Sequence, residues 1–304
     1  MRVALLEGPV PARRLAYVRA AVCGFATVYV AIRSTHLWAV TRLRTDRFDP
    51  VGVVSLLVDA PTSRLVVGVT IAATVATGAA ATLGWRFRWT GPTFALLLLW
   101  VLSYRLSWGQ VLHTENLMVL HVIVLGFSPS AFAFSLDSRG REPVPDERSF
   151  GWALQLMTLL TVLSYAIAAW AKIRNGGMDW MTGDVLRNQV AYDNLRKHLL
   201  GDVHSAFGGW LTRYRWLFPP LATASMVIEI GALAAIPRSR LRPLWVGGAW
   251  LFHVGVLVLM AILFPYQLLG FAFLSALPVE AIVDRGLGRW RRSRAGSAAR
   301  PRGG

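Results

Sequence analysis

Long apolar stretches recur along almost the whole of this sequence, and they constrain its fold more than any other feature. A stretch of about 17–25 residues is long enough to cross the ~30 Å hydrocarbon core of a bilayer as a helix. Such stretches lie at residues 15–39, 65–83, 94–107, 117–134, 150–171, 217–236, 244–264 and 266–282, the third being short and the last interrupted by a proline. The sequence therefore predicts an all-α, polytopic membrane helical bundle of about eight transmembrane helices, with residues 15–283 as its transmembrane domain.

The composition favours the same class of protein. Hydrophobic residues make up 55% of the 304 residues, and the mean hydropathy is +0.47. With glycine counted among the apolar residues the fraction is roughly 60%, against ~45–50% for soluble domains, which argues against a soluble enzyme. Intrinsic disorder is excluded because it requires low hydrophobicity. The single cysteine, Cys23, excludes a disulfide framework and a cysteine-based metal site, so no metal is expected.

Charge predicts the topology. Lys and Arg total 32 against 16 acidic residues, and cytoplasmic loops of membrane proteins gather such cations. The shortest loops on one side are nearly free of cations, which predicts both termini in the cytoplasm of a multi-pass cell-membrane protein. Residues 1–14 form a cytoplasmic N-terminal segment, and residues 284–304 form a disordered, Arg-rich tail that binds anionic lipid. No nucleic-acid partner is expected.

The segment 175–215 is too apolar and aromatic for a plain linker. Apolar residues from Trp180 to Leu195 recur at roughly helical spacing, with charged and polar residues between them. This pattern predicts an amphipathic helix that lies in the outer membrane interface. Such a helix would cover a cavity that opens to that side.

Lys172 lies at the outer end of the fifth stretch, and it has two interpretations. Its stem could lie in lipid while the ammonium group reaches the interface. Alternatively, it could be a partly desolvated amine that acts as a base. The chain has thirty arginines and only two lysines. Because arginine would reach the interface equally well, the use of lysine at this position favours the second interpretation, in which an amine is required. We expect Lys172 to face a cavity bounded by the fourth, fifth and seventh helices and the amphipathic segment, with no acidic partner.

Glu229 and His253 lie at similar depth on consecutive predicted helices. Ionisable groups inside a membrane are costly unless they are paired, so the sequence predicts a Glu229–His253 pair that acts as a strut, as a proton relay or as a contact to substrate. His121, near the outer end of the fourth stretch, is a further candidate site residue. The spacing of the histidines does not favour a metal site.

Short motifs around single polar residues carry a family resemblance. These are Ser128-Pro129 followed by Ser135-Leu136-Asp137; Tyr165-Ala-Ile-Ala-Ala-Trp-Ala-Lys172-Ile173 with Trp180 and Gly183; Glu229 within Met-Val-Ile-Glu-Ile; and His253 with Met260 and Phe264. Over residues 18–280 the chain resembles the HTTM family, a bacterial transmembrane domain similar to the membrane part of vitamin K-dependent γ-carboxylase.

The resemblance implies a specific chemistry. Lys172 matches the lysine with which the carboxylase deprotonates reduced vitamin K, whose reaction with oxygen gives the strong base that precedes CO₂ addition to peptide glutamate. It also implies a reduced, vitamin K-like quinone as the cofactor and a substrate site that includes Tyr165 and Trp180. Quinone or isoprenoid-lipid chemistry is the form of this activity that we expect here.

Three functions therefore remain open. The first is a carboxylase-like membrane enzyme that uses Lys172 as base on a quinone or another lipid-soluble substrate, and it requires a cavity that reaches Lys172. The second is a proton-linked small-solute transporter that uses Glu229 and His253, and it requires a continuous polar path. The third is a non-catalytic membrane partner protein, in which the buried polar groups are all paired and no cavity remains.

Overall fold

The computed structural model describes residues 10–109, 113–142, 150–182, 184–237 and 240–285, and no β-strand occurs among them. Five helical segments in that part of the chain are long and apolar enough to cross a membrane. They are Ala12–Arg42, Arg64–Leu83, Gly151–Gly176, Arg215–Ala235 and Leu241–Met260. The all-α membrane bundle is therefore confirmed, with fewer such spans than the eight predicted.

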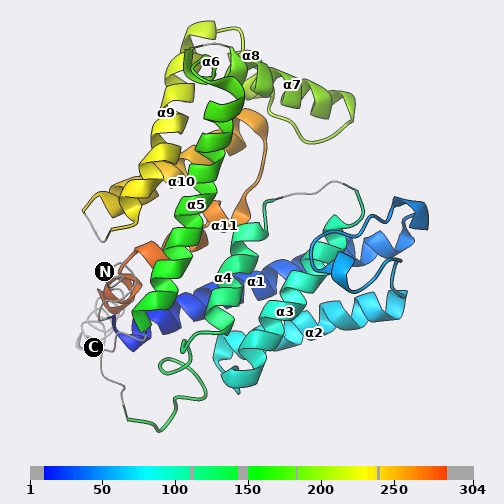
Figure 1. Ribbon diagram of the computed structural model, residues 1–304, viewed down its shortest axis with the longest axis vertical. Coiled ribbons are helices and arrows are strands. Elements are labelled where there is room, and N and C mark those ends of the chain that lie inside the picture. The colour runs from blue at the N-terminus through cyan, green and yellow to red at the C-terminus, as the bar shows by residue number, and fades with distance from the viewer. Residues whose placement is uncertain (1–9, 110–112, 143–149, 183, 238–239, 286–304) are drawn as a thin grey trace, which may run out of the picture.

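The first half of the chain forms one group of helices, in which consecutive helices contact each other. They are α1 (Ala12–Ala39), α2 (Arg64–Leu83), α3 (Phe87–Leu106) and α4 (Asn116–Gly126). Short 3₁₀ turns connect α1 to α2: η1 (Val40–Arg42), η2 (Thr45–Arg47) and η3 (Val54–Leu56). Helices α1, α2 and α3 run alongside one another and cross the direction of the helices that follow (Figure 1).

The second half is built around α5 (Gly151–Gly176), which contacts α4 on one side and α9 (Phe218–Gly231) on the other. Helix α9 follows the turn η5 (Arg215–Leu217), continues into η6 (Ala232–Ala235) and contacts α10 (Leu241–Met260). Three short helices lie across the upper end of this group (Figure 1): α6 (Asp179–Thr182), α7 (Val185–Leu199) and α8 (Ala206–Leu211). The chain then returns through α11 (Pro265–Leu268) and η7 (Phe271–Ala276).

Two predicted spans are not continuous helices. The fourth ends at Gly126, eight residues early, because Pro129 cannot continue a helix and the Ser128 hydroxyl donates to the carbonyl of Leu125. The last is divided at Gly270, whose φ of 81° is incompatible with a right-handed helix. The third is longer than predicted, since α3 begins seven residues before the expected start.

A buried arginine joins the first group of helices. The guanidinium group of Arg19, which is fully buried, donates to the carbonyl oxygens of Ala81 at 2.8 Å and Phe134 at 2.6 Å. Because the last carbonyls of a helix lack intrahelical partners, Arg19 satisfies the end of α2 and holds the loop after α4 against it. In that loop, Asp137 accepts the backbone N–H groups of Arg86 and Phe87 and so caps α3.

The two ends of the described chain lie together (Figure 1). Arg14 at the start of α1 makes two hydrogen bonds to Glu280, and Arg13 forms an ion pair with Asp284 at 3.1 Å. The ends therefore lie at the same side of the bundle. The Arg-rich tail falls largely outside the described residues.

Candidate functional site

Lys172 lies one turn before the end of α5, and its ammonium group forms an ion pair with Glu229 on α9. The distance from Nζ to Oε1 is 2.5 Å, and the two side chains are 19% and 3% exposed. The expectation that Lys172 has no acidic partner is therefore wrong. The error arose because depth along the helix was compared without the direction of the side chain. A helical side chain leans toward the N-terminus of its helix, so the lysine stem extends back from the C-terminal end of α5 toward Glu229.

Two aromatic rings complete the surroundings of the ammonium group. Nζ lies 4.7 Å from the ring centroid of Trp180 on α6 and 5.7 Å from that of Phe252 on α10. The negative face of an aromatic ring attracts a cation, and more strongly where water is excluded. Trp180, which the resemblance implied as part of the substrate site, is buried and in contact with Lys172. Phe252 was not predicted, because no local pattern marks a phenylalanine in an apolar helix.

A cavity of about 530 Å³ opens at Lys172. Its walls come from α5, α9, α10 and the short helices of the amphipathic segment, and apolar side chains dominate the lining: Trp180, Leu186, Val190, Leu211, Leu221, Ala224, Ile228, Leu251, Phe252, Val254, Val256, Val258, Leu259 and Met260. The polar lining side chains besides Lys172 are Gln189 and Ser225. The predicted fourth helix supplies none of the lining, and α9, which carries Glu229, takes its place.

His253 binds Tyr165 rather than Glu229. Its Nε2 lies 2.8 Å from the Tyr165 hydroxyl, which comes from α5 two turns before Lys172. The predicted Glu229–His253 pair is thus replaced by two pairs, because α5 supplies a partner to each residue, Lys172 to Glu229 on α9 and Tyr165 to His253 on α10. Among the described residues, Oε2 of Glu229 and Nδ1 of His253 have no hydrogen-bond partner. Neither Tyr165 nor His253 lines the cavity.

His121 lies in a different part of the bundle. It is fully buried, with Nδ1 2.7 Å from the Tyr266 hydroxyl and Nε2 3.0 Å from the carbonyl of Met157. These contacts join α4, α5 and α11. The structure therefore does not bring His121 to the cavity, and its geometry is that of a strut.

The amphipathic segment is fixed to the end of α10. Asn194 and Lys197 on α7 donate to the carbonyls of Leu259 and Met260 at 2.8 and 2.7 Å, and the Ser205 hydroxyl donates to that of Val258 at 2.6 Å. These carbonyls end a helix and lack intrahelical partners. Lys197, the second lysine of the chain, thus caps the C-terminal end of α10. This role was not predicted from the sequence. The spacing of three residues between Asn194 and Lys197, which places both on one face of a helix, is the pattern that could have indicated it.

Comparison with known families identifies the domain. The family model described as the HTTM domain matches residues 9–277, which includes every residue of the site described above. Comparison with curated proteins and with solved structures gave no match.

Proposed function

The chain belongs to the HTTM domain family, and from that premise we propose that it is a membrane enzyme that acts on a quinone or another lipid-soluble substrate with Lys172 as base. The observation that carries this proposal is the apolar cavity whose wall includes the Lys172 side chain, paired with Glu229. Sites for small molecules are typically 300–1,000 Å³, mostly apolar, with a few polar groups that orient the ligand. The volume and lining of this cavity fit a lipid-soluble molecule with one polar end.

The ion pair supplies a route to a neutral amine. Transfer of one proton from Nζ of Lys172 to Oε1 of Glu229 gives an amine and a carboxylic acid, and it exchanges two buried charges for none. The amine then takes a proton from an acidic hydroxyl group of the substrate: the substrate O–H bond breaks, an N–H bond forms, and the substrate oxygen keeps the electron pair. Trp180 and Phe252 stabilise the resulting ammonium ion.

A reduced quinone bound in the cavity would supply that hydroxyl group and the redox chemistry. The residues of this chain that would hold it are the apolar side chains of α9 and α10, with Gln189 and Ser225 as additional polar contacts. A lipid-soluble substrate would enter from the bilayer. The chemistry at the protein is limited to proton transfer at Nζ.

The alternatives are less well supported. A non-catalytic partner protein should have every buried polar group paired and no cavity, whereas this chain has both a cavity and unpaired atoms on Glu229 and His253. A proton-linked transporter that uses these two residues would need them in one continuous path. Each instead has its own partner on α5.

The experiment that tests the proposal is the Lys172→Arg variant. Arginine can keep the ion pair with Glu229 but cannot act as a neutral base at physiological pH. Quinone and lipid profiles of a deletion strain supply the assay, and we expect Lys172→Arg to fail to restore the wild-type profile. Lys197→Arg is the matched control, since that lysine caps α10, pairs with Asp193 and does not line the cavity. Full restoration by Lys172→Arg would overturn the catalytic role.

We also propose a cell-membrane location with both termini cytoplasmic. The nearly cation-free short loops on one side and the Arg-rich tail support it. A cysteine introduced at Ser297 should be inaccessible to an impermeant thiol reagent added to intact cells. Labelling from outside would show that the C-terminus is extracellular, and it would leave the proposal for Lys172 unaffected.

A further inference from the structure

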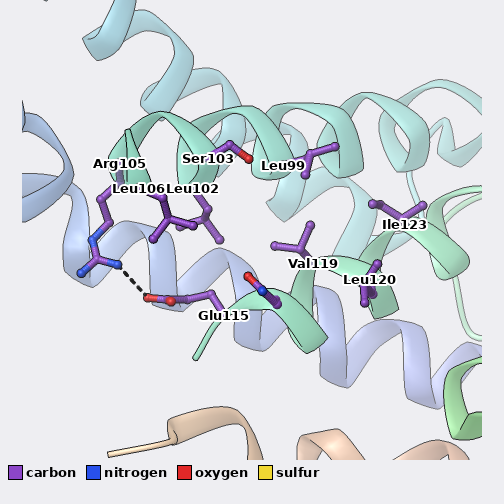
Figure 2. Close-up of a pocket in the computed structure, with 10 residues that line it drawn as sticks. Leu99, Leu102, Ser103, Arg105, Leu106, Glu115, Val119, Leu120 and Ile123 are labelled. Atoms are coloured by element: carbon purple, nitrogen blue, oxygen red, sulfur yellow. Dashed lines mark hydrogen bonds and ion pairs between the residues drawn. The ribbon is translucent and has the colours of Figure 1, made fainter. Parts of the chain in front are cut away.

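A second hollow lies between α3 and α4, remote in sequence from the Lys172 cavity. It has a volume of about 190 Å³ and is lined by both helices (Figure 2). Arg105 and Glu115 lie at one end of it, and Leu99 and Ile123 lie toward the other end (Figure 2). The hollow is therefore a short amphipathic groove with a charged end and an apolar end.

The charged end carries more positive than negative charge. Glu115 is buried, and its Oε1 lies 3.4 Å from Nη1 of Arg105 and 3.6 Å from Nη1 of Arg33. The same carboxylate also accepts hydrogen bonds from the hydroxyl groups of Tyr29 at 2.6 Å and Thr114 at 2.5 Å. The single Glu115 carboxylate thus pairs with two guanidinium groups, those of Arg33 and Arg105. The three side chains together have a net charge of +1.

Arg105 has donors to spare. Its side chain is 14% exposed, and among the described residues its guanidinium group makes one long hydrogen bond, to Glu115. Guanidinium has five N–H donors in a fixed fork that matches carboxylate and phosphate oxygens. Ser103 and Asn116, which also line the groove, add further polar groups at its wall. An anionic group beside Arg105 would balance the charge of the cluster and use these donors.

We propose that this groove binds an anionic phospholipid, with the phosphate at Arg105 and one acyl chain between α3 and α4. The apolar wall has the residue types that an acyl chain contacts: Leu99, Leu102, Leu106, Val119, Leu120 and Ile123. Arg105 lies in the last turn of α3, where the predicted span ends and the headgroup region of a bilayer begins. The phospholipid fits this position because its phosphate and its chain occupy adjacent layers of the membrane.

Native mass spectrometry of the purified full chain tests the proposal. The protein is titrated in detergent with phosphatidylglycerol, phosphatidylcholine or oleate, and bound molecules are counted. We expect phosphatidylglycerol to bind preferentially, and Arg105→Gln to weaken that binding about tenfold or more, as the loss of a charged hydrogen bond predicts. Arg88→Gln, at the opposite end of the same helix and exposed, is the matched control and should bind like wild type.

A second variant separates lipid binding from folding. Leu120→Trp fills the groove from a half-exposed position and leaves the charges in place, and it should also reduce phosphatidylglycerol binding. Equal binding of phosphatidylcholine, equal losses in Arg88→Gln and Arg105→Gln, or undiminished binding by Leu120→Trp would each overturn the proposal. Oleate binding without phosphatidylglycerol binding would overturn it in favour of a free fatty acid.

Discussion

The Nζ atom of Lys172 lies 2.5 Å from the Oε1 atom of Glu229, so two ionisable groups inside the bundle neutralise each other at the wall of an apolar cavity. A buried ion pair adds little to stability by itself, because both charges lose their hydration. Leaving one member alone is far more costly. The pair therefore connects α5 to α9 and holds the Lys172 ammonium group at the wall of the cavity.

This relationship predicts an asymmetric mutational result. Lys172→Met leaves the Glu229 carboxylate buried without a partner, and we expect a loss of unfolding free energy of about 3–5 kcal/mol. The double variant Lys172→Met/Glu229→Leu removes both charges and should recover most of that loss. Thermal unfolding in detergent measures the stability of the single and the double variant relative to wild type. A double variant less stable than Lys172→Met would show that the pair is not what couples these positions.

Tyr165 and His253 should behave as a strut. Tyr165→Phe removes the partner of Nε2 of His253 and should lower the unfolding free energy by about 1–3 kcal/mol, the cost of an unsatisfied buried group. Since neither residue lines the cavity, the variant should still restore the quinone and lipid profile of the deletion strain at a permissive temperature. Loss of that activity in a fully folded variant would instead support a proton relay through His253.

The long helices could be predicted because an unbroken apolar stretch can cross a membrane only as a helix, which pairs its own backbone N–H and C=O groups. The predicted stretches 15–39 and 65–83 agree with α1 and α2 within a few residues. The failures have local causes, a proline after α4 and a positive φ at Gly270. Sequence alone identified Glu229 and His253 as residues that need partners, and Lys172 as a residue that faces a cavity. It could not assign the partners, because depth along a helix does not give the direction of a side chain.

Gly84 should be intolerant of a side chain. Its φ is 64°, and a Cβ atom there would collide with Nη1 of Arg19 and Cβ of Ser135. Gly84→Ala should therefore displace the Arg19 cap and lower the unfolding temperature. Gly247→Ala is the control, because that glycine lies inside α10 with open space around it, and alanine favours a helix by about 1 kcal/mol. Equal stability of the two variants would contradict the role of Arg19.

The Glu115 cluster predicts a dependence of stability on pH. Burial by itself would raise the pKa of Glu115, but the hydrogen bonds from Thr114 and Tyr29 and the charges of Arg105 and Arg33 lower the pKa below its ordinary value of 4.5. A carboxylate with a lowered pKa stabilises the folded state above its unfolded pKa and loses that effect as pH falls through the folded value. The stability difference between wild type and Glu115→Gln should therefore be constant near neutral pH and shrink below about pH 4.5. A difference that does not change with pH would contradict the ionised state of Glu115.

The hydrogen bonds of Asn194 should hold the covering segment over the Lys172 cavity. Its amide donates to the carbonyls of Val190 and Leu259 and accepts from the backbone N–H of Ser205, so one side chain joins α7, α10 and the start of α8. Asn194→Leu leaves the end of α10 and the N–H of Ser205 without these partners.

The expected result is local loosening, because the other contacts of α5, α9 and α10 are unchanged. Limited proteolysis between residues 184 and 205 should accelerate several-fold, while the unfolding temperature of the bundle falls little. The affinity for a soluble quinone analogue should fall as well, since Leu186, Gln189 and Val190 on α7 form part of the cavity wall. Asn188→Leu, an exposed position on the same helix, is the matched control. Unchanged proteolysis in Asn194→Leu would show that apolar packing alone holds the segment, and unchanged affinity would show that the ligand contacts only α9 and α10.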